Sequence, residues 1–533
     1  MKSFKRKQAN LFISCLLLVT LACATAQDTF AATPTPTAGL QPVKKITVPT
    51  WTAVGAATQT STDVWSFDSS TNTMYFADRV NKGVSVIDTN TNTYLGTLKV
   101  PTCDVAANRP GSCPSGVVVA PDLHRLVVTD RNTVVTATGV TVDLKSIFIY
   151  DLRLLSAPPV KLDMPLGTNS DELDYNPINH RVYVGNTAPP FFVTVVDLLT
   201  NTIVDQIPLP GAPEQPRFNP IDGFVYVTVP GAPIPAILRI DTTKSGAAAI
   251  VGNLLTPLCD SRAIDIDPLT NDAFVGCAAP ATGAPAGSGA QLLVNLNGAM
   301  SIVNSFPGVN GTDTGQFNSN LRRFYTASSN NIASVSCPTN AAGVAPVVGV
   351  FSAPTNSQPK GALVGAECSG TNGHDIGVDP VHNQVYVAGR QAAGDPGFST
   401  ALGNGTPGVL VWHDPAPLAQ PEIIEESSAL LAALTSQGAN GRVLFEDSHI
   451  VRARLNHLPA GTTALLNVTT TIGNELVNCN KDGSNATCGG VLKGEALLGG
   501  NVLMSTGGAP LASGNIRHGN GGFGDDGQHG HDD

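Results

Sequence analysis

The stretch LDYNPINHRVYV, residues 173–184, shows the unit from which most of the chain is built. Alternating apolar residues lead to an Asn-Pro pair, a short polar turn follows, and the chain returns through a segment rich in Val and Tyr. Alternation with a period of two is typical of a β-strand with one buried face, and Asn and Pro favour tight turns. The stretch therefore predicts an antiparallel hairpin.

The same pattern occurs seven times along the chain. We call the turn-forming residue of each copy its anchor, and the anchors are Asp68, Ala120, Asn176, Asn219, Asp267, Asn318 and Asp379. The acid and amide anchors are interpreted as turn formers, because such side chains bind the backbone two residues further on. In most copies a third strand follows, often ending in an acid or amide, and then a fourth that often ends in Pro. Four strands in about 50 residues are typical of a propeller blade.

The ends of the repeat region predict how the ring closes. The seventh copy has no obvious fourth strand after Asp414, whereas residues 43–49 form an unassigned strand before the first copy. Pairing the first strand of the chain with the last blade would remove the exposed edges. The sequence thus predicts an all-β fold, with a seven-bladed β-propeller over residues 42–415 closed by an N-terminal strand.

Two motifs carry a resemblance to a known family. The segment Val182-Tyr183-Val184-Gly185-Asn186, and the strand at residues 84–88 followed by Thr-Asn-Thr-Asn-Thr, resemble the YVTN-repeat β-propeller family of exported bacterial proteins. The resemblance covers about residues 42–415, although copies two, five and six depart from the motif. It implies a secreted or periplasmic propeller and no particular reaction.

The N-terminus has the features of a secretory leader. A basic segment at residues 2–7 precedes an apolar stretch at residues 11–22, and Ala24-Thr25-Ala26 fits a signal-peptidase site. We expect a signal peptide at residues 1–26 and a linker at 27–41. Lipid anchoring at Cys23 is the alternative. No second apolar stretch is long enough to span a bilayer.

The cysteines beyond the leader predict disulfides in an oxidising compartment. Pairing of sequence neighbours gives Cys103 with Cys113, Cys259 with Cys277, Cys337 with Cys368, and Cys479 with Cys488. No spacing matches a zinc site or a haem attachment motif.

The remainder of the chain predicts a small C-terminal domain. Residues 416–421 are interpreted as a linker. Residues 422–516 are expected to contain one short amphipathic helix, at 422–436, and a small β-sandwich-like domain. Residues 517–533 are expected to be disordered. The tail residues His518, His529 and His531, with the neighbouring Asp residues, would bind a metal only weakly.

Polar residues converge where the innermost strands begin. Counting five residues back from each anchor gives Asp63, Ser115, Asp171, Glu214, Arg262, Asp313 and His374, and counting four back gives Val64, Gly116, Glu172, Gln215, Ala263, Thr314 and Asp375. The innermost strands of a propeller line its channel, so these residues should meet at one mouth. Channel mouths are wet, and polar residues are expected there even without a function.

Three functional hypotheses follow from this cluster. The first is an exported scaffold that binds an unidentified protein, polysaccharide or small molecule, with ligand contacts from Asp63, Asp171, Glu172, Glu214, Gln215, Arg262, Asp313 and His374. Glu172, Glu214 and Asp313 would hold Ca²⁺ through carboxylate oxygens. The second is a periplasmic or secreted lactonase-like hydrolase in which His374, Asp375 and Arg262 are the catalytic candidates and Ca²⁺ could take part. The third, an electron-transfer propeller, lacks a haem motif.

Charge and motifs exclude several other classes. The formal net charge is −11 and only 13% of residues are charged. No basic stripe suggests nucleic-acid binding. The absence of a phosphate-binding loop, of H-E-x-x-H and of G-x-S-x-G argues against the commoner nucleotide-binding, metalloprotease and α/β-hydrolase mechanisms.

Overall fold

The computed structural model describes residues 38–416 with short gaps, and strands of a second region between residues 427 and 518. The gaps in the first region are 52, 55–56, 59–60, 104–112, 132, 136–140, 144, 165–168, 221, 231–233, 268–269, 279–289, 332–336, 338–343, 356–357, 371–372 and 391–405. The expected signal peptide, most of the expected linker after it, and residues 519–533 lie outside the described residues.

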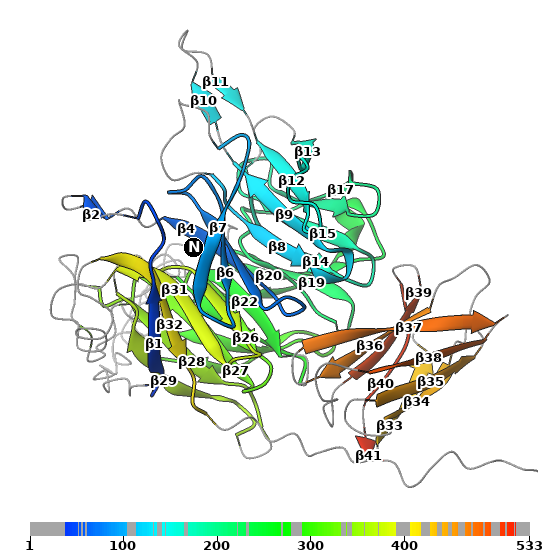
Figure 1. Cartoon of the computed structure of the whole chain (residues 1–533). Coiled ribbons are helices and arrows are strands. Elements are labelled where there is room, and N and C mark those ends of the chain that lie inside the picture. The colour runs from blue at the N-terminus through cyan, green and yellow to red at the C-terminus, as the bar shows by residue number, and fades with distance from the viewer. Residues whose placement is uncertain are drawn as a thin grey trace, which may run out of the picture. The chain divides into compact units, whose positions relative to one another are not determined.

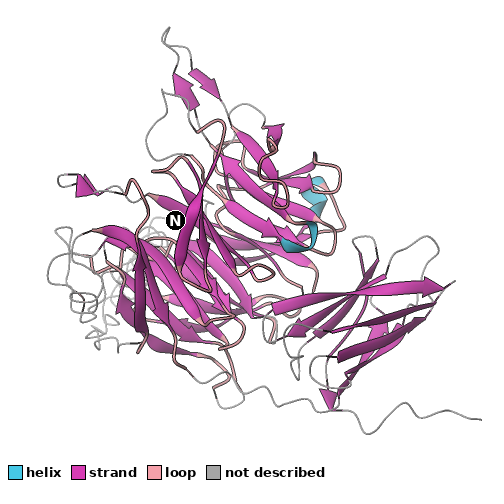
Figure 2. Cartoon of the chain, in the orientation of Figure 1, coloured by secondary structure: helices cyan, strands magenta, loops and turns pink. Residues whose placement is uncertain are grey.

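The seven repeat copies form seven four-stranded antiparallel sheets, which confirms the predicted propeller (Figures 1 and 2). The first three blades are β4 (Thr62–Asp68), β5 (Thr73–Asp78), β6 (Gly83–Asp88) and β7 (Thr93–Lys99); β8 (Val117–Ala120), β9 (Arg125–Asp130), β12 (Ser146–Asp151) and β13 (Val160–Asp163); and β14 (Ser170–Asn176), β15 (Arg181–Asn186), β16 (Phe192–Asp197) and β17 (Thr202–Pro208).

The next three blades continue in the same order. They are β18 (Pro216–Phe218), β19 (Phe224–Val229), β20 (Ala236–Asp241) and β21 (Ile250–Leu255); β22 (Ser261–Asp267), β23 (Asp272–Cys277), β24 (Gln291–Asn295) and β25 (Ser301–Phe306); and β26 (Thr314–Asn318), β27 (Arg323–Ser328), β28 (Val347–Ser352) and β29 (Ala362–Cys368). Two short hairpins lie outside the blades: β2 (Ala53–Val54) with β3 (Ala57–Thr58), and β10 (Thr133–Val135) with β11 (Thr141–Asp143).

The seventh blade contains the N-terminal strand, as predicted. It comprises β30 (Ile376–Asp379), β31 (Gln384–Arg390), β32 (Pro407–His413) and β1 (Gln41–Ile46). Strand β1 runs antiparallel to β32, with Gln41 opposite His413 and Ile46 opposite Val409, and Figure 1 shows the dark blue β1 beside the yellow blade. The innermost strands contact one another in a closed cycle, β4–β8–β14–β18–β22–β26–β30–β4.

Acid and amide anchors cap the turns of blades one, three and seven, as the sequence predicts. Asp68 Oδ1 accepts the Ser70 N–H at 2.9 Å, and Asn176 Oδ1 accepts the Ile178 N–H at 2.8 Å. In the seventh blade Asp379 repeats this bond with the residue two positions on. These local bonds fix the hairpin between the first and second strands of a blade.

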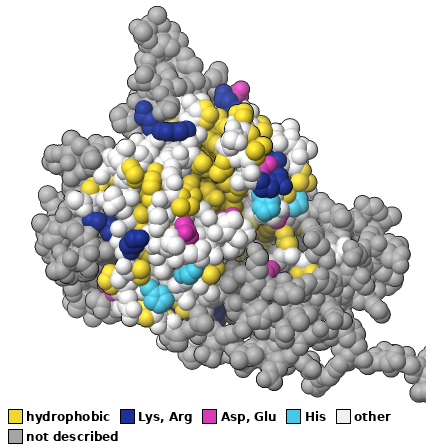
Figure 3. Space-filling model, in the orientation of Figure 1, with side chains coloured by type: hydrophobic (Ala, Val, Ile, Leu, Met, Phe, Trp, Pro, Cys, Tyr) yellow, Lys and Arg dark blue, Asp and Glu magenta, His cyan; other side chains and the backbone are white. Residues whose placement is uncertain are grey.

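Side chains of the second strands fill the space between blades. Tyr183, Tyr226, Tyr325 and Tyr386, from the Val/Tyr-rich strands, are each at most 2% exposed. The outermost strands instead leave aliphatic side chains such as Leu95 and Val204 in contact with solvent. In the view of Figure 3, charged side chains are sparse on the described surface.

Three of the expected disulfides are formed: Cys103–Cys113, Cys259–Cys277 and Cys337–Cys368. Cys259–Cys277 spans the first two strands of blade five, and Cys337–Cys368 spans the last two strands of blade six. The fourth expected pair lies in the C-terminal region, where Cys479 is disulfide-bonded and lies opposite Cys488 in the strand register.

The C-terminal region is all-β in its described residues. Its strands are β33 (Ser427–Ala433), β34 (Asn440–Phe445), β35 (Ile450–Asn456), β36 (Ala464–Thr470), β37 (Gly473–Asp482), β38 (Asn485–Val491), β39 (Asn501–Thr506), β40 (Ala509–Asn515) and β41 (Arg517–His518). Strand β33 pairs with both β34 and β40, so the antiparallel pairings run in a closed cycle. The tail expected to be disordered begins with β41, which pairs with Ser427 and Ser428.

The prediction of a helix within residues 422–436 is wrong for the part of this segment that the structure describes. Residues Ser427–Ala433 form strand β33. Short apolar runs fit a buried strand and a helix equally well, and periodicity alone does not separate them. Here the backbone groups bind two neighbouring strands, and this pairing overrides the local preference.

No helix within the described residues is both long enough and apolar enough to cross a membrane.

Candidate functional site

β-Bulges at the start of the innermost strands present the polar residues at the channel mouth. In blade three Ser170 lies opposite Asn186 and Leu173 opposite Val184, so Asp171 and Glu172 together oppose a single residue, Gly185. The same irregularity occurs before Trp65 in blade one and before Ala263 in blade five. A bulge re-aims side chains that regular alternation would send to opposite faces.

Glycine lets two blades approach at the bulge of blade three. A Cβ atom on Gly185 would lie 3.2 Å from the Glu214 carbonyl oxygen and 3.5 Å from that of Glu172. The close approach brings the starts of blades three and four together. Glu172, on β14, and Glu214, two residues before β18, thereby belong to neighbouring blades at the same end of the ring.

We call the charged residues gathered here the mouth cluster, which comprises Asp63, Arg79, Arg131, Asp171, Glu172, Glu214, Arg262, Asp313, His374 and Asp375. Its members interact across the ring. Burial lowers the pKa of Arg79, Arg131 adds to this effect, and Asp171, Asp375 and Asp313 oppose it. These five residues belong to blades one, two, three, seven and six.

Two arginines pair with carboxylates near the first three blades. Arg79 forms an ion pair with Asp63, and its Nε donates to the Pro114 carbonyl oxygen at 3.2 Å. Arg131 Nη1 lies 2.8 Å from Asp171 Oδ2, joining blade two to blade three. Both arginines directly follow the last residue of their blade's second strand. Because that strand runs antiparallel to the innermost strand, its end lies beside the start of the innermost strand, at the mouth.

Arg262 links the next three blades. Its Nη1 donates to Asp313 Oδ1 at 2.9 Å and lies 3.9 Å from Glu214 Oε1. The guanidinium group therefore lies between two carboxylates of the expected Ca²⁺ set and shares its charge with both. Burial opposes the charged form of Arg262, but Asp313 and Glu214 more than offset this and raise its pKa.

Glu172 is the most deeply enclosed carboxyl group of blade three. The residue is 5% exposed, and its Oε2 has no hydrogen-bond partner among the described residues. Burial raises the pKa of Glu172 well above its ordinary value, and the charges of Glu214, Asp171 and Asp313 raise it further. Burial likewise raises the pKa of Glu214 to about 8.

Asp375 and His374 lie where blade seven meets blade one. Asp375 is 1% exposed, and its Oδ2 accepts the Thr62 hydroxyl at 2.9 Å and lies 3.2 Å from His374 Nε2. Burial raises the pKa of Asp375 to about 6, an effect that His374 opposes. Ligand atoms of Asp63, His374 and Asp375 all lie within 4.8 Å of one another.

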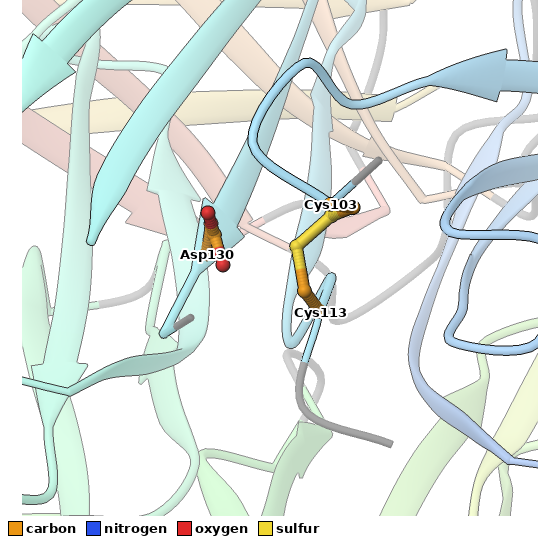
Figure 4. Close-up of side chains that lie close together, drawn as sticks. All are labelled: Cys103, Cys113 and Asp130. Carbon is orange, nitrogen blue, oxygen red and sulfur yellow. A yellow bond between two sulfur atoms is a disulfide. The ribbon is translucent and has the colours of Figure 1, made fainter. Parts of the chain in front are cut away.

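A second group with metal-ligating residue types does not have the chemistry for a metal. Cys103, Cys113 and Asp130 lie close together, but the two sulfur atoms are joined in a disulfide and are not thiolates (Figure 4). The Asp130 carboxylate instead accepts a hydrogen bond from Thr102.

One predicted ligand residue has a structural role. Gln215 is 3% exposed, and its Oε1 accepts the Ile264 N–H at 2.9 Å, which joins blade four to blade five. The other predicted site residues belong to the mouth cluster. Counting along the innermost strands did not find Arg79 and Arg131. The sequence pattern that could have found them is an Asp-Arg pair at the end of a blade's second strand.

A second charged group lies two residues before the anchors of blades three, four and five and was not predicted. Arg217 Nη1 lies 3.6 Å from Asp174 Oδ1, and its Nε lies 3.2 Å from Asp265 Oδ1. Burial raises the pKa of both Asp174 and Asp265, and Arg217 opposes the rise in each. This Asp–Arg–Asp group connects blades three, four and five.

No family model matches the sequence, and a search of curated proteins finds no match. Among solved structures, a chain of hydrazine synthase from Kuenenia stuttgartiensis is similar, with 13% sequence identity and a TM-score of 0.47. The alignment covers 63% of this chain and 96% of that chain. At this level the likeness concerns the fold alone.

Proposed function

We propose that the protein is an exported propeller scaffold that binds a cationic ligand at the mouth of its channel, with Glu172 and Glu214 as the principal contacts. Carboxyl groups outnumber guanidinium groups in the mouth cluster. Asp63, Asp171 and Asp313 each have an arginine partner within salt-bridge distance. Glu214 shares Arg262 with Asp313 at a longer distance of 3.9 Å, and Asp375 lies 3.2 Å from His374. Glu172 Oε2 has no hydrogen-bond partner among the described residues.

The unpartnered Oε2 of Glu172 is the observation that carries the proposal. A buried carboxylate without a partner is costly, and the group avoids the cost by holding a proton or by meeting a cation. Two neighbouring glutamates with raised pKa values thus form a site whose ionised state an incoming cation stabilises. Either Ca²⁺ or a protonated amine supplies that charge.

Export and family membership are part of the proposal. The basic and apolar N-terminal segments favour a secretory leader, and the disulfides are consistent with an oxidising compartment. The Val-Tyr-Val-Gly-Asn segment of β15 and the turn-capping Asp and Asn anchors support placing the chain among YVTN-type propellers, secreted or periplasmic.

Hydrolysis by His374, Asp375 and Arg262 remains a prediction with less support. An anion clamp needs an arginine with unshared positive charge. Arg262 instead faces Asp313 and Glu214, which offset that charge. Binding is therefore the better account of the same residues.

Calorimetric titration of the chain that begins at residue 27, stripped of metals, tests the proposal. One arm uses CaCl₂ and the other spermidine, so that the two sources of positive charge are distinguished. We expect saturable binding in one arm, weakened at least about tenfold, or by about 1.4 kcal/mol, in Glu172→Gln and Glu214→Gln. The control is Asp163→Asn, which removes an exposed carboxylate on β13.

Thermal unfolding of the same variants separates a lost contact from a lost fold. Glu172→Gln should retain the midpoint of the ligand-free chain, because a neutral amide avoids the cost of a buried charge. Absence of binding in both arms, or unchanged affinity in the two glutamate variants, would show that the mouth is not a cation site.

A further inference from the structure

The contact between blades seven and one holds the first and last innermost strands of the ring. Asp63 lies on β4, whereas His374 and Asp375 directly precede β30. The Thr62 hydroxyl donates to Asp375 Oδ2 across this boundary. Residues more than three hundred positions apart in the sequence therefore share one small cluster.

The three side chains have the geometry of a metal site. One carboxylate oxygen of each aspartate and one ring nitrogen of His374 lie within 4.8 Å of one another. Ligands that surround a single ion at bond lengths of about 2.0–2.2 Å lie at most roughly twice that distance apart. The spacing is thus compatible with all three contacting the same ion after small rotations of the side chains.

An unpartnered oxygen provides a second, independent observation. Asp375 is 1% exposed, and its Oδ1 has no hydrogen-bond partner among the described residues. Its other oxygen already accepts the Thr62 hydroxyl. A buried carboxylate oxygen without a donor requires a compensating positive partner.

We propose that Asp63, His374 and Asp375 bind a divalent transition-metal ion of the Zn²⁺, Co²⁺ and Mn²⁺ class. An imidazole nitrogen with two carboxylates suits these ions, whereas Ca²⁺ and Mg²⁺ prefer oxygen ligands alone. Three protein ligands leave coordination positions for water or a ligand at the mouth.

Arg79 fits this site as an orienting group. It pairs with Oδ2 of Asp63 and is itself held by the Pro114 carbonyl oxygen. Hydrogen-bonded neighbours commonly fix the orientation of ligating carboxylates. The arginine also offsets one of the two aspartate charges, which limits the repulsion between the carboxylates before the metal binds.

The metal site is separate from the proposed cation contacts. Those contacts are on blades three and four, and the metal ligands are on blades one and seven. Ca²⁺ or spermidine binding reports on Glu172 and Glu214, and Co²⁺ binding reports on His374 and Asp375, so either proposal can fail alone.

Metal content and Co²⁺ spectroscopy test the site. The tail histidines would confuse the result, so His518, His529 and His531 are first replaced with Ala in an otherwise complete chain without a histidine tag. This parent protein is stripped with EDTA, titrated with CoCl₂ while visible absorption is recorded, and separately dialysed against ZnCl₂ for metal analysis. We expect one equivalent of either ion, unaffected by excess Mg²⁺.

Two ligand variants and one matched control complete the experiment. His374→Ala and Asp375→Asn should weaken Co²⁺ binding at least tenfold. His180→Ala is the control, because His180 Nδ1 lies 3.1 Å from Asp122 Oδ2 and so forms a similar His–Asp pair, with no third metal-ligating residue beside it among the described residues. Circular dichroism of the metal-free variants verifies folding, and His374→Ala provides the test if Asp375→Asn does not fold.

Three outcomes would overturn the site: no stoichiometric metal in the parent protein, undiminished Co²⁺ binding in folded His374→Ala, or equal weakening in His180→Ala. Saturating Zn²⁺ should also raise the thermal midpoint of the parent and leave that of His374→Ala unchanged, because only a ligand of the native state stabilises it.

Discussion

Asp222 is a half-buried carboxyl group whose hydrogen bonds lie within blade four, and Arg239 connects this group to blade five. Its Oδ2 accepts the Tyr226 hydroxyl at 2.6 Å, and its Oδ1 accepts the Phe224 N–H at 3.0 Å. Arg239 donates to the Tyr226 oxygen from Nε at 2.9 Å and reaches the Gly298 carbonyl oxygen of blade five. Burial outweighs these hydrogen bonds and raises the pKa of Asp222 to about 6.

This pKa makes stability depend on pH in a defined direction. Between about pH 4 and 6 the native state holds the Asp222 proton while the unfolded chain has lost it, so the free energy of unfolding falls as the pH rises through that window. Asp222→Asn should make the fall less steep, by on the order of 1 kcal/mol across the window. Urea denaturation at pH 4, 5, 6 and 7, with disulfides intact, measures the free energy of unfolding at each pH and hence this slope.

The matched control for this experiment is Asp163→Asn, which removes an exposed carboxylate and should leave the slope as in the parent. A slope in Asp222→Asn identical to that of the parent protein would show that Asp222 does not titrate in this window.

Counting from the anchors predicted most of the mouth cluster, because strand geometry makes equal positions equivalent in every blade. It did not predict Arg79 and Arg131, which enter from the second strand, where the count was not applied. Nor did it predict that Arg262 neutralises Asp313, since a pairing between blades depends on which rotamers the packed ring allows. The repeat shows which residues lie at the channel mouth, whereas the ion pairs that these residues form are seen only in the folded structure.

The innermost strand of each blade is the edge of its sheet, so its outer backbone N–H groups have no strand partner. In several blades a side chain of the preceding blade accepts a hydrogen bond from one of these groups. The side chain two residues before the anchor accepts the N–H one residue before the next anchor. Asp174 accepts from Phe218 at 2.6 Å, Asp265 from Phe317 at 2.7 Å, and Gln316 from Val378 at 2.9 Å. Ser66 does the same for Val119 at 3.0 Å. These bonds satisfy edge N–H groups that no strand pairs.

The pattern changes where the residue two before the anchor is glycine. A Cβ atom on Gly377 would lie 2.9 Å from both the Met74 sulfur and Trp65 Cε3. Hydrophobic packing thus replaces the hydrogen bond between blades seven and one. The absence of a side chain makes room for Trp65, which is 2% exposed.

Gln316→Leu should destabilise the ring through the loss of two bonds. Gln316 also donates from Nε2 to the Trp65 carbonyl oxygen at 2.9 Å, so the substitution leaves a donor and an acceptor without their partner. We expect a loss of about 2 kcal/mol in the free energy of unfolding, measured by urea denaturation. Gln206→Leu, on the exposed face of β17, should change it by less than about 0.5 kcal/mol. Equal values for the two variants would refute the role of this bond.

The whole ring depends on a strand supplied from far away in the sequence. Sequence reasoning found this closure because the count left one unassigned strand before the first copy and one strand missing from the last copy. Ile46 and Val48, in and just after β1, are 3% and 1% exposed and pack in a cluster with Trp65, Met74 and Phe76. The same segment thus pairs with blade seven and fills the space beside blade one.

Two truncations of the chain that begins at residue 27 test the importance of closure. Removing residues 27–37 should leave stability unchanged, because β1 remains. Removing residues 27–49 exposes the outer edge of β32 and takes away Leu40, Ile46 and Val48, each buried. Burial of an aliphatic side chain is worth about 1.5–3 kcal/mol, so the loss should reach at least about 4 kcal/mol. Urea denaturation measures the loss, and size-exclusion chromatography should show association through the exposed edge. If both truncated chains unfold at the same urea concentration and remain monomeric, blade seven holds the ring without its fourth strand.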